Sequence, residues 1–254
     1  MTETESGAAP GLPPPARLIA AVDATWPPAQ TCHRAGWVLR RGAGGGQRVS
    51  AASPLAPGHA PDIATAEAAM RAWGQVPLFR LAEGEEAVDA ALAAAGYAVH
   101  DPVVLYAAPV ARLTDARDET ARIIRVSTPL ALAADIWAAG GIGPERRAVM
   151  ARAAGARIAL LARLGDRAAG CAFTACDGPV AMLHAMEVLA GFRRAGAGRQ
   201  LLHGAANWAA EQGTEVLALA VTEANAPARA LYEAAGMTVA ARYHYRRLPE
   251  GSPT

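Results

Sequence analysis

The chain has 254 residues, of which 52% are apolar and 19% are charged, and its formal net charge at pH 7 is +1. That length accommodates one large domain or two small ones, and the near-neutral charge argues against nucleic acid or an anionic membrane as a partner. All 24 basic residues are arginines, so the chain offers neither a Schiff-base lysine nor the lysine of a P-loop.

Two further features of the composition concern location and metals. We find no run of about 18 apolar residues and no basic-then-apolar leader, which predicts a cytoplasmic protein that does not insert into a membrane. Cys32, Cys171 and Cys176 lack the spacing of metal ligands. We interpret them as reduced apolar side chains and expect no metal site.

The N-terminal half is predicted to be a mixed α/β lobe. Residues 1–16 contain a Pro-Pro-Pro run without apolar periodicity and are expected to form a disordered tail. Residues 17–112 alternate short apolar runs with Ala-rich helical stretches. The expected strands are 36–40, 48–53, 76–81 and 103–106, and the expected helices are 63–73 and 85–95. The charged residues 113–122 are expected to link this lobe to a second one.

The second lobe, residues 123–254, has a clearer pattern. Its expected elements are, in order, helices 129–138 and 144–154, strands 157–163, 168–174 and 180–189, helix 198–212, strand 216–221, helix 227–235 and strand 239–246. Turn residues separate the three consecutive strands, which predicts an antiparallel meander. The expected fold class is α/β (α+β), with a mixed, mostly antiparallel twisted sheet flanked by helices in each lobe.

A weak internal repeat relates the two lobes at an offset of about 140 residues. The matching pairs are Gly96 with Gly236, Val99 with Val239 and Val76 with Val216. The repeat indicates two copies of one fold, although Ala-rich, Gly-ended helices followed by strands also resemble one another by chance. In this alignment Tyr232 falls opposite Leu92.

A glycine-containing turn precedes the helix expected at 198–212. Arg193, Gly196 and Gly198 have the spacing Arg-x-x-Gly-x-Gly directly after a strand. Glycines let a phosphate approach the backbone, and the unpaired N–H groups at a helix start attract an anion. A dinucleotide fingerprint needs a third glycine where Leu201 stands, so that motif is excluded. On its own the glycine pair is also consistent with a structural turn.

The segment from Asn225 to Met237 makes the pattern more specific. Its sequence is Asn-Ala-Pro-Ala-Arg-Ala-Leu-Tyr-Glu-Ala-Ala-Gly-Met. Together with the glycine turn, over roughly residues 168–245, it resembles the GNAT superfamily of N-acetyltransferases. Met237 stands where Phe is usual, and residues 190–192 replace a Pro-containing approach to the turn. The resemblance implies a tandem GNAT arrangement with a degenerate N-terminal copy, acetyl-CoA as co-substrate, and acyl transfer to a primary amine.

The resemblance also implies which residues hold the co-substrate. The pantetheine arm would pair with strand backbone near Met186 and Val188. The diphosphate would rest mainly on main-chain groups of the turn, formed by Arg193, Arg194, Ala195, Gly196, Ala197, Gly198 and Arg199. Asn225 and Arg229 would contact the cofactor as well, although Asn225 is equally suited to cap the helix that follows it.

Two catalytic roles follow from the resemblance. Tyr232 would be the general acid for the leaving thiolate, whereas its alternative is a ring packed on the core face of its helix. Glu187 would be the general base, directly or through a water, and its alternative is a structural carboxylate in an ion pair. His184 lies three residues before Glu187, so a regular strand would point the two to opposite faces, but a bulge would change that parity. His244 is a further candidate for the acceptor pocket, with a surface position on an edge strand as the alternative.

The acceptor itself is not specified by the sequence. It is expected to be a small-molecule or peptide amine, and monomer and homodimer are both open. Two alternatives to an enzyme also stay open, a non-catalytic acyl-CoA-binding or sensing module and an interaction protein built from two degenerate copies.

Overall fold

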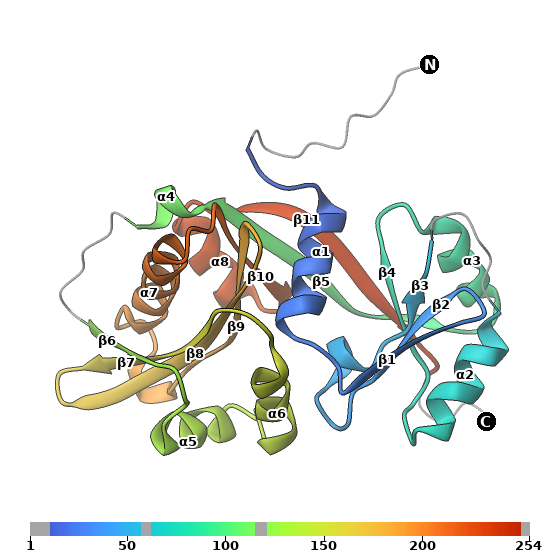
Figure 1. Cartoon of the computed structure of the whole chain (residues 1–254), viewed down its shortest axis with the longest axis horizontal. Coiled ribbons are helices and arrows are strands. Elements are labelled where there is room, and N and C mark those ends of the chain that lie inside the picture. Colours follow the sequence, from blue (N-terminus) through green and yellow to red (C-terminus); the bar gives the residue numbers. More distant parts are fainter. Residues whose placement is uncertain (1–10, 57–61, 115–120, 250–254) are drawn as a thin grey trace.

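The computed structural model describes residues 11–56, 62–114 and 121–249 (Figure 1). Most of the predicted tail, residues 1–10, lies outside the described residues. The rest of it runs into helix α1, Pro15–Thr25, which the sequence analysis did not anticipate. Proline at its first turn is compatible with a helix start, and Leu18, Ala21 and Val22 on its inner face are fully buried.

One eight-stranded sheet runs through the molecule in the order β4-β11-β5-β10-β9-β8-β7-β6. Its strands are β4 (Leu78–Ala82), β5 (Ala98–Pro109), β6 (Ala121–Val126), β7 (Arg157–Leu164), β8 (Arg167–Asp177), β9 (Val180–Val188), β10 (Val216–Thr222) and β11 (Thr238–Arg247). The described pairings are antiparallel except for β9 with β10. The prediction of a mixed, mostly antiparallel sheet flanked by helices is confirmed.

A small second sheet completes the N-terminal part. It contains β1 (Gln30–Arg34), β2 (Trp37–Arg41) and β3 (Ser53–Pro54), and the short helix η1 (Gln47–Val49) lies between β2 and β3. A parallel bridge from Ala52 to Phe79 connects it to β4. The predicted strand 48–53 is wrong for most of its length, because the chain turns through η1 there.

Helices cover both faces of the sheets. The remaining helices are α2 (Ile63–Ala72), α3 (Glu86–Ala94), α4 (Val110–Leu113), α5 (Ala131–Ala139), α6 (Pro144–Arg152), α7 (Ala197–Glu211) and α8 (Ala226–Ala234), with a short turn η2 (Ala190–Phe192) before α7. One apolar core joins α4, α7 and α8 to one face, while α1, α5 and α6 pack on the other. Helices α2 and α3 enclose a separate core with β2 and β4. No helix in the described ranges is long and apolar enough to cross a membrane.

The two lobes exchange their last strands. Strand β5 of the N-terminal half lies between β10 and β11, and β11 in turn pairs with β4. The registers obey the repeat, since Phe79 pairs with Arg246 just as Leu219 pairs with Tyr106, each residue shifted by 140. The two lobes are therefore interleaved in one sheet. The placing of their boundary at 113–122 stays a prediction, and β6 already begins at Ala121.

Candidate active site

Strands β9 and β10 separate part of the way along their length. Their parallel pairing runs from Val180 with Val216 to Leu183 with Leu219, and both strands then continue, β9 to Val188 and β10 to Thr222. On its other side β9 stays paired with β8 up to Val188. The C-terminal half of β9 therefore presents backbone groups toward β10 that the sheet does not pair.

A β-bulge reorients side chains at this point of β9. Glu187 pairs with Cys171 and His184 pairs with Phe173, so the register shifts between the two pairs. Ala185, inside the shift, has a left-handed φ of 49°. The buried Trp137 fixes the bulge, because its Nε1 donates to the carbonyl oxygen of Ala185 over 2.8 Å.

The bulge places Glu187 and His184 on the same face of the sheet. Cys171 and Phe173 are two residues apart in a regular part of β8, so they share a face, and their cross-strand partners share it too. A regular strand would place Glu187 and His184 on opposite faces, and that expectation is therefore wrong for this segment.

The carboxylate of Glu187 rests against a glycine of the loop after α5. A Cβ added at Gly140 would lie 2.6 Å from Cγ of Glu187 and would overlap its carboxyl group. Arg193 approaches from the glycine turn, with its Nη2 3.6 Å from Oε1 of Glu187. The Glu187 side chain keeps 21% of its surface exposed, so it is held in place and still reaches solvent. The sequence analysis did not identify Gly140, although its Gly-Gly pair was a usable signal.

The glycine turn is open to solvent. Arg193, Arg194 and Ala195 are exposed, and Nε of Arg193 donates to the carbonyl oxygen of Val188 over 3.2 Å. Gly196 is the N-cap of α7 with φ 87°, a left-handed conformation that favours glycine. Helix α7 starts at Ala197, and its first N–H groups lack partners within the helix.

The rest of the turn packs inward. Gly198 lies against α8, since an added Cβ would be 3.1 Å from Cδ2 of Leu231. Arg199 is exposed at the first turn of α7, whereas Met186 and Val188 on β9 are partly buried against the core. All the residues predicted to hold a diphosphate thus border one solvent-facing turn, and their binding roles stay predictions.

Tyr232 on α8 packs next to an aromatic residue of the exchanged strand. Its ring centroid lies 5.9 Å from that of Tyr106 on β5, and only 7% of Tyr232 is exposed. Burial raises the pKa of the Tyr232 phenol, which therefore stays protonated. The described part of the chain supplies no hydrogen-bond partner to its hydroxyl. Tyr106 also donates to the carboxylate of Glu233. The sequence analysis did not identify Tyr106 as a neighbour of Tyr232, because strand exchange is not visible in a sequence.

Asn225 and Arg229 have structural partners. Oδ1 of Asn225 accepts from the backbone N–H of Ala228 over 3.2 Å, so this residue is the N-cap of α8. Nε of Arg229 donates to the hydroxyl of Tyr106 over 3.3 Å, and its Nη1 donates to the carbonyl oxygen of Glu223 over 3.3 Å. Contact with a cofactor by either residue stays a prediction.

The two candidate histidines differ in setting. His184 is 3% exposed and packs against the rings of Trp26 and Phe173, which makes it a core residue. His244 lies on β11, which pairs on both sides, so its predicted edge-strand position is wrong. Its Nε2 lies 2.7 Å from Oδ1 of Asp89, in the N-terminal half. Among the described residues no group of three metal-ligating side chains is found.

Comparisons with known proteins agree with this geometry. A model of the acetyltransferase (GNAT) family matches residues 133–237, from α5 to Met237 just after α8. A GCN5-related N-acetyltransferase from Kribbella flavida has a similar structure, with a TM-score of 0.71 and 19% identity over 93% of this chain and 96% of that one. A tandem GNAT protein from the clavulanic acid biosynthesis pathway is similar at a TM-score of 0.61 and 17% identity, over 90% of this chain and 86% of its own.

A functionally unknown conserved protein from Staphylococcus epidermidis is also similar, with a TM-score of 0.66 and 13% identity over 85% and 92% of the two chains. No curated protein sequence matches the chain. The structural similarities concern the fold, and they extend over both lobes. The family match contains the bulged strand, the glycine turn and the α8 motif, and the C-terminal lobe therefore contains an acetyltransferase (GNAT) family domain.

Proposed function

We propose that the C-terminal lobe transfers an acetyl group from acetyl-CoA to a primary amine. The observation that carries this proposal is the separation of β9 from β10 next to an exposed glycine turn, with a buried phenol on the adjoining helix. The GNAT fold supports acyl transfer in general. The acetyl group, the amine acceptor and the roles of individual residues are the parts that we propose.

The residues around the turn are suited to a diphosphate. The N–H groups at the start of α7 and the left-handed turn at Arg194 and Gly196 present donors to an anion, and Arg193 adds a positive charge. The unpaired backbone of β9 near Met186 and Val188 would accept an extended amide-containing arm by strand addition. These are the residues that would hold acetyl-CoA, which would supply the activated acyl group.

Glu187 and Tyr232 would divide the proton transfers. Glu187 would take a proton from the attacking amine, since its carboxylate is partly exposed on the bulged strand. Tyr232 would give its proton to the departing sulfur, because burial keeps the phenol protonated. The C–S bond then breaks as the C–N bond forms, and the free thiol leaves.

The proposal is tested by thiol release. The full-length protein is incubated with acetyl-CoA and a panel of small-molecule and peptide amines, and free thiol is measured with and without each amine. Amine-dependent thiol release at a rate above the uncatalysed reaction is expected. Binding of acetyl-CoA without release for any amine would instead support a sensing module. A cytoplasmic location, a monomer or homodimer, and the absence of nucleic-acid or membrane partners remain expectations.

A further inference from the structure

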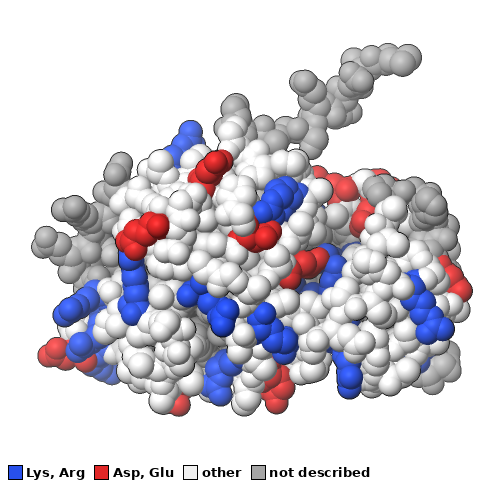
Figure 2. Space-filling model, in the orientation of Figure 1, with Lys and Arg blue, Asp and Glu red and all other residues white. Residues whose placement is uncertain are grey.

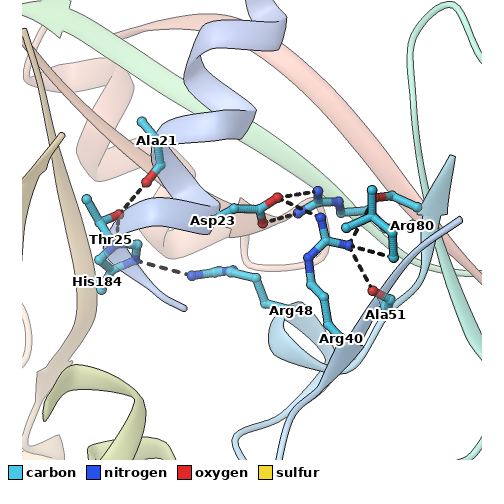
Figure 3. Close-up of polar contacts among 10 residues, drawn as sticks. Ala21, Asp23, Thr25, Arg40, Arg48, Ala51, Arg80 and His184 are labelled. Carbon is cyan, nitrogen blue, oxygen red and sulfur yellow. Dashed lines mark hydrogen bonds and ion pairs between the residues drawn. The ribbon is translucent and has the colours of Figure 1, made fainter. Parts of the chain in front are cut away.

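Two arginines bind one carboxylate at the junction of the two lobes, and a third arginine nearby is bonded to a histidine (Figure 3). Asp23 on α1 accepts from Nη2 of Arg40 at 2.8 Å and from both terminal nitrogens of Arg80 at 2.7 and 2.8 Å. Although burial raises the pKa of Asp23, Arg80 and Arg40 hold it below its usual value, so it is ionised. The third arginine, Arg48, has no carboxylate partner in the described part of the chain. The cluster therefore carries an excess of positive charge.

Arg48 is fixed in position by a neutral histidine. Its Nη1 donates to Nδ1 of His184 over 3.3 Å, so the proton of the ring is on Nε2. That Nε2 donates to the hydroxyl of Thr25 over 2.8 Å, and Thr25 donates to the carbonyl oxygen of Ala21 over 2.6 Å. Burial and the charge of Arg48 lower the pKa of His184 well below its usual value. Because His184 stays neutral, it orients the guanidinium without neutralising it.

Two buried polar atoms, one in this guanidinium and one in a neighbouring tyrosine, form no hydrogen bond of normal geometry. Nε of Arg48 and the hydroxyl of Tyr243 are both buried without a hydrogen-bond partner among the described residues. Tyr243 is 3% exposed, and the guanidinium of Arg80 lies 5.8 Å from its ring centroid. Burial lowers the pKa of Arg48, but its interactions with Tyr243 and Tyr245 raise it above its usual value, so these groups lie close together. Buried polar groups normally form well-aligned hydrogen bonds, and Nε of Arg48 and the Tyr243 hydroxyl do not, so this positively charged pair points to a missing anionic acceptor. Burial also makes such charge-assisted contacts strong.

The cluster is reachable and adjoins the proposed active site. Figure 2 shows acidic and basic atoms together in the hollow between the two parts of the molecule. Arg40, Arg80 and Tyr243 are buried, but Arg48 is only partly buried, so it is the member of the cluster that solvent reaches. His184, which holds Arg48, lies on the same face of β9 as Glu187, three residues away. An amine close to Glu187 could therefore extend its other end to Arg48.

We propose that the Arg48 cluster, formed by Arg40, Arg48, Arg80 and Tyr243, binds a carboxylate of the acceptor, so that the acceptor is an amine that also carries a carboxylate. Arg48 is its principal contact, because Arg40 and Arg80 already bind Asp23. This inference rests on the proposed function. It narrows the acceptor to amino acids, including ω-amino acids and short peptides with a free C-terminus.

The first test compares acids with their amides. Thiol release from acetyl-CoA is measured with glycine, 4-aminobutanoic acid, 6-aminohexanoic acid and glycylglycine, each beside its carboxamide. For the preferred acid we expect kcat/KM at least about tenfold above that of its amide, the loss typical of a missing charged hydrogen bond. Arg48→Met should bring that ratio close to one, mainly through KM.

Control variants separate recognition from folding. Arg125→Met makes the same change at an exposed arginine of β6 whose Nη1 is 2.7 Å from Glu211, and it should leave the acid-to-amide ratio unaltered. Arg48→Lys should restore part of the ratio, because it keeps the charge without the planar donors. If Arg48 had only a structural role between the lobes, Arg48→Met would lower activity on acids and amides equally. That result, or a wild-type ratio near one, would overturn the inference.

A binding measurement keeps this inference distinct from the proposed function. Calorimetry with N-acetylglycine, N-acetyl-4-aminobutanoate and their amides requires no turnover. The protein could bind these carboxylates, and lose that binding in Arg48→Met, yet release no thiol with any amine tested. That result would refute acyl transfer but support the anion site. Equal binding of acids and amides, no binding of either, or preference for inorganic phosphate over every carboxylate would overturn the carboxylate assignment.

Discussion

The segment α7–β10–α8–β11 and its repeat α2–β4–α3–β5 have the same order of helices and strands, but they differ in their polar side chains. Helix α3 covers Glu86–Ala94 and α8 covers Ala226–Ala234, which is the same span displaced by 140. Where α8 has Tyr232, α3 has the fully buried Leu92. Where α8 is capped by Asn225, Glu85 makes no side-chain cap and instead accepts from the backbone of Ala82. The strand pairings of the two segments thus correspond, while Tyr232 and the Asn225 cap have no counterpart in the N-terminal segment.

A second pair of equivalent positions shows the same divergence. In the C-terminal copy Arg229 contacts the hydroxyl of Tyr106 at 3.3 Å, a long hydrogen bond in a partly open setting. The equivalent residues in the other copy are Asp89 and Arg246, which form a two-point ion pair at 2.7 Å for each contact. The hydrogen bond from Arg246 lowers the pKa of Asp89 to about 2, although partial burial opposes the shift. The N-terminal copy thus has a two-point ion pair at this position, whereas the C-terminal copy has a single, longer hydrogen bond.

The largest effect on the rate of thiol release is expected from substituting Tyr232, and none is expected from substituting its counterpart Leu92. Tyr232→Phe removes the proposed acid, so kcat for thiol release should fall by about 10²–10⁴-fold. Affinity for CoA, measured by calorimetry, should change by no more than about twofold because the hydroxyl would act on the leaving group. Leu92→Met, a volume-conserving change in the repeat, should leave kcat unaltered. Equal losses in both variants would show that the two positions are simply core residues.

The next effect concerns the base. Gly140→Ala is compatible with the backbone at φ −90°, but its methyl group would displace the carboxyl group of Glu187. A displacement of about 1 Å at a catalytic group can cost about 10²-fold in rate, and we expect a loss of that order in kcat with little change in thermal stability. Gly191→Ala is the matched control, since nothing lies within 4 Å of its added Cβ. Full activity of the Gly140 variant would remove Glu187 from the mechanism.

The smallest effect tests the ion pair of the N-terminal copy. Asp89→Asn should lower the free energy of unfolding by about 1 kcal/mol at pH 7, a discounted value because the carboxylate is 27% exposed. The folded-state pKa is depressed, so this stability is present above the ordinary value of 3.8 and is lost as the pH falls toward 2. Denaturant titrations of both proteins at pH 7 and in this acidic range measure the difference. A gap of constant size across the range would contradict the ion-pair explanation.

Local patterns were sufficient for most of the fold and for the residues around the turn. Helix α7 and strands β7 to β11 lie within a few residues of their predicted bounds, because their apolar periodicity and glycine ends are local signals. The exchange of β5 and β11 was not predictable, since an apolar strand does not specify which strand it pairs with. Which face of the sheet Glu187 lies on depends on the bulge at Ala185. That bulge is held by Trp137, which lies 48 residues before Ala185 in the sequence. Helix α1 was missed because a Pro-rich start concealed a helix with proline at its first turn.

We propose that the turn at Gly196 and the start of α7 bind CoA, and that the repeated copy does not. Calorimetric titration of the full-length protein with CoA tests this directly. We expect one site per chain, and Gly196→Val should abolish it, because a β-branched residue is strained at φ 87° and crowds the turn. Two sites per chain, or one site that survives Gly196→Val unchanged, would show that CoA does not bind at this turn alone.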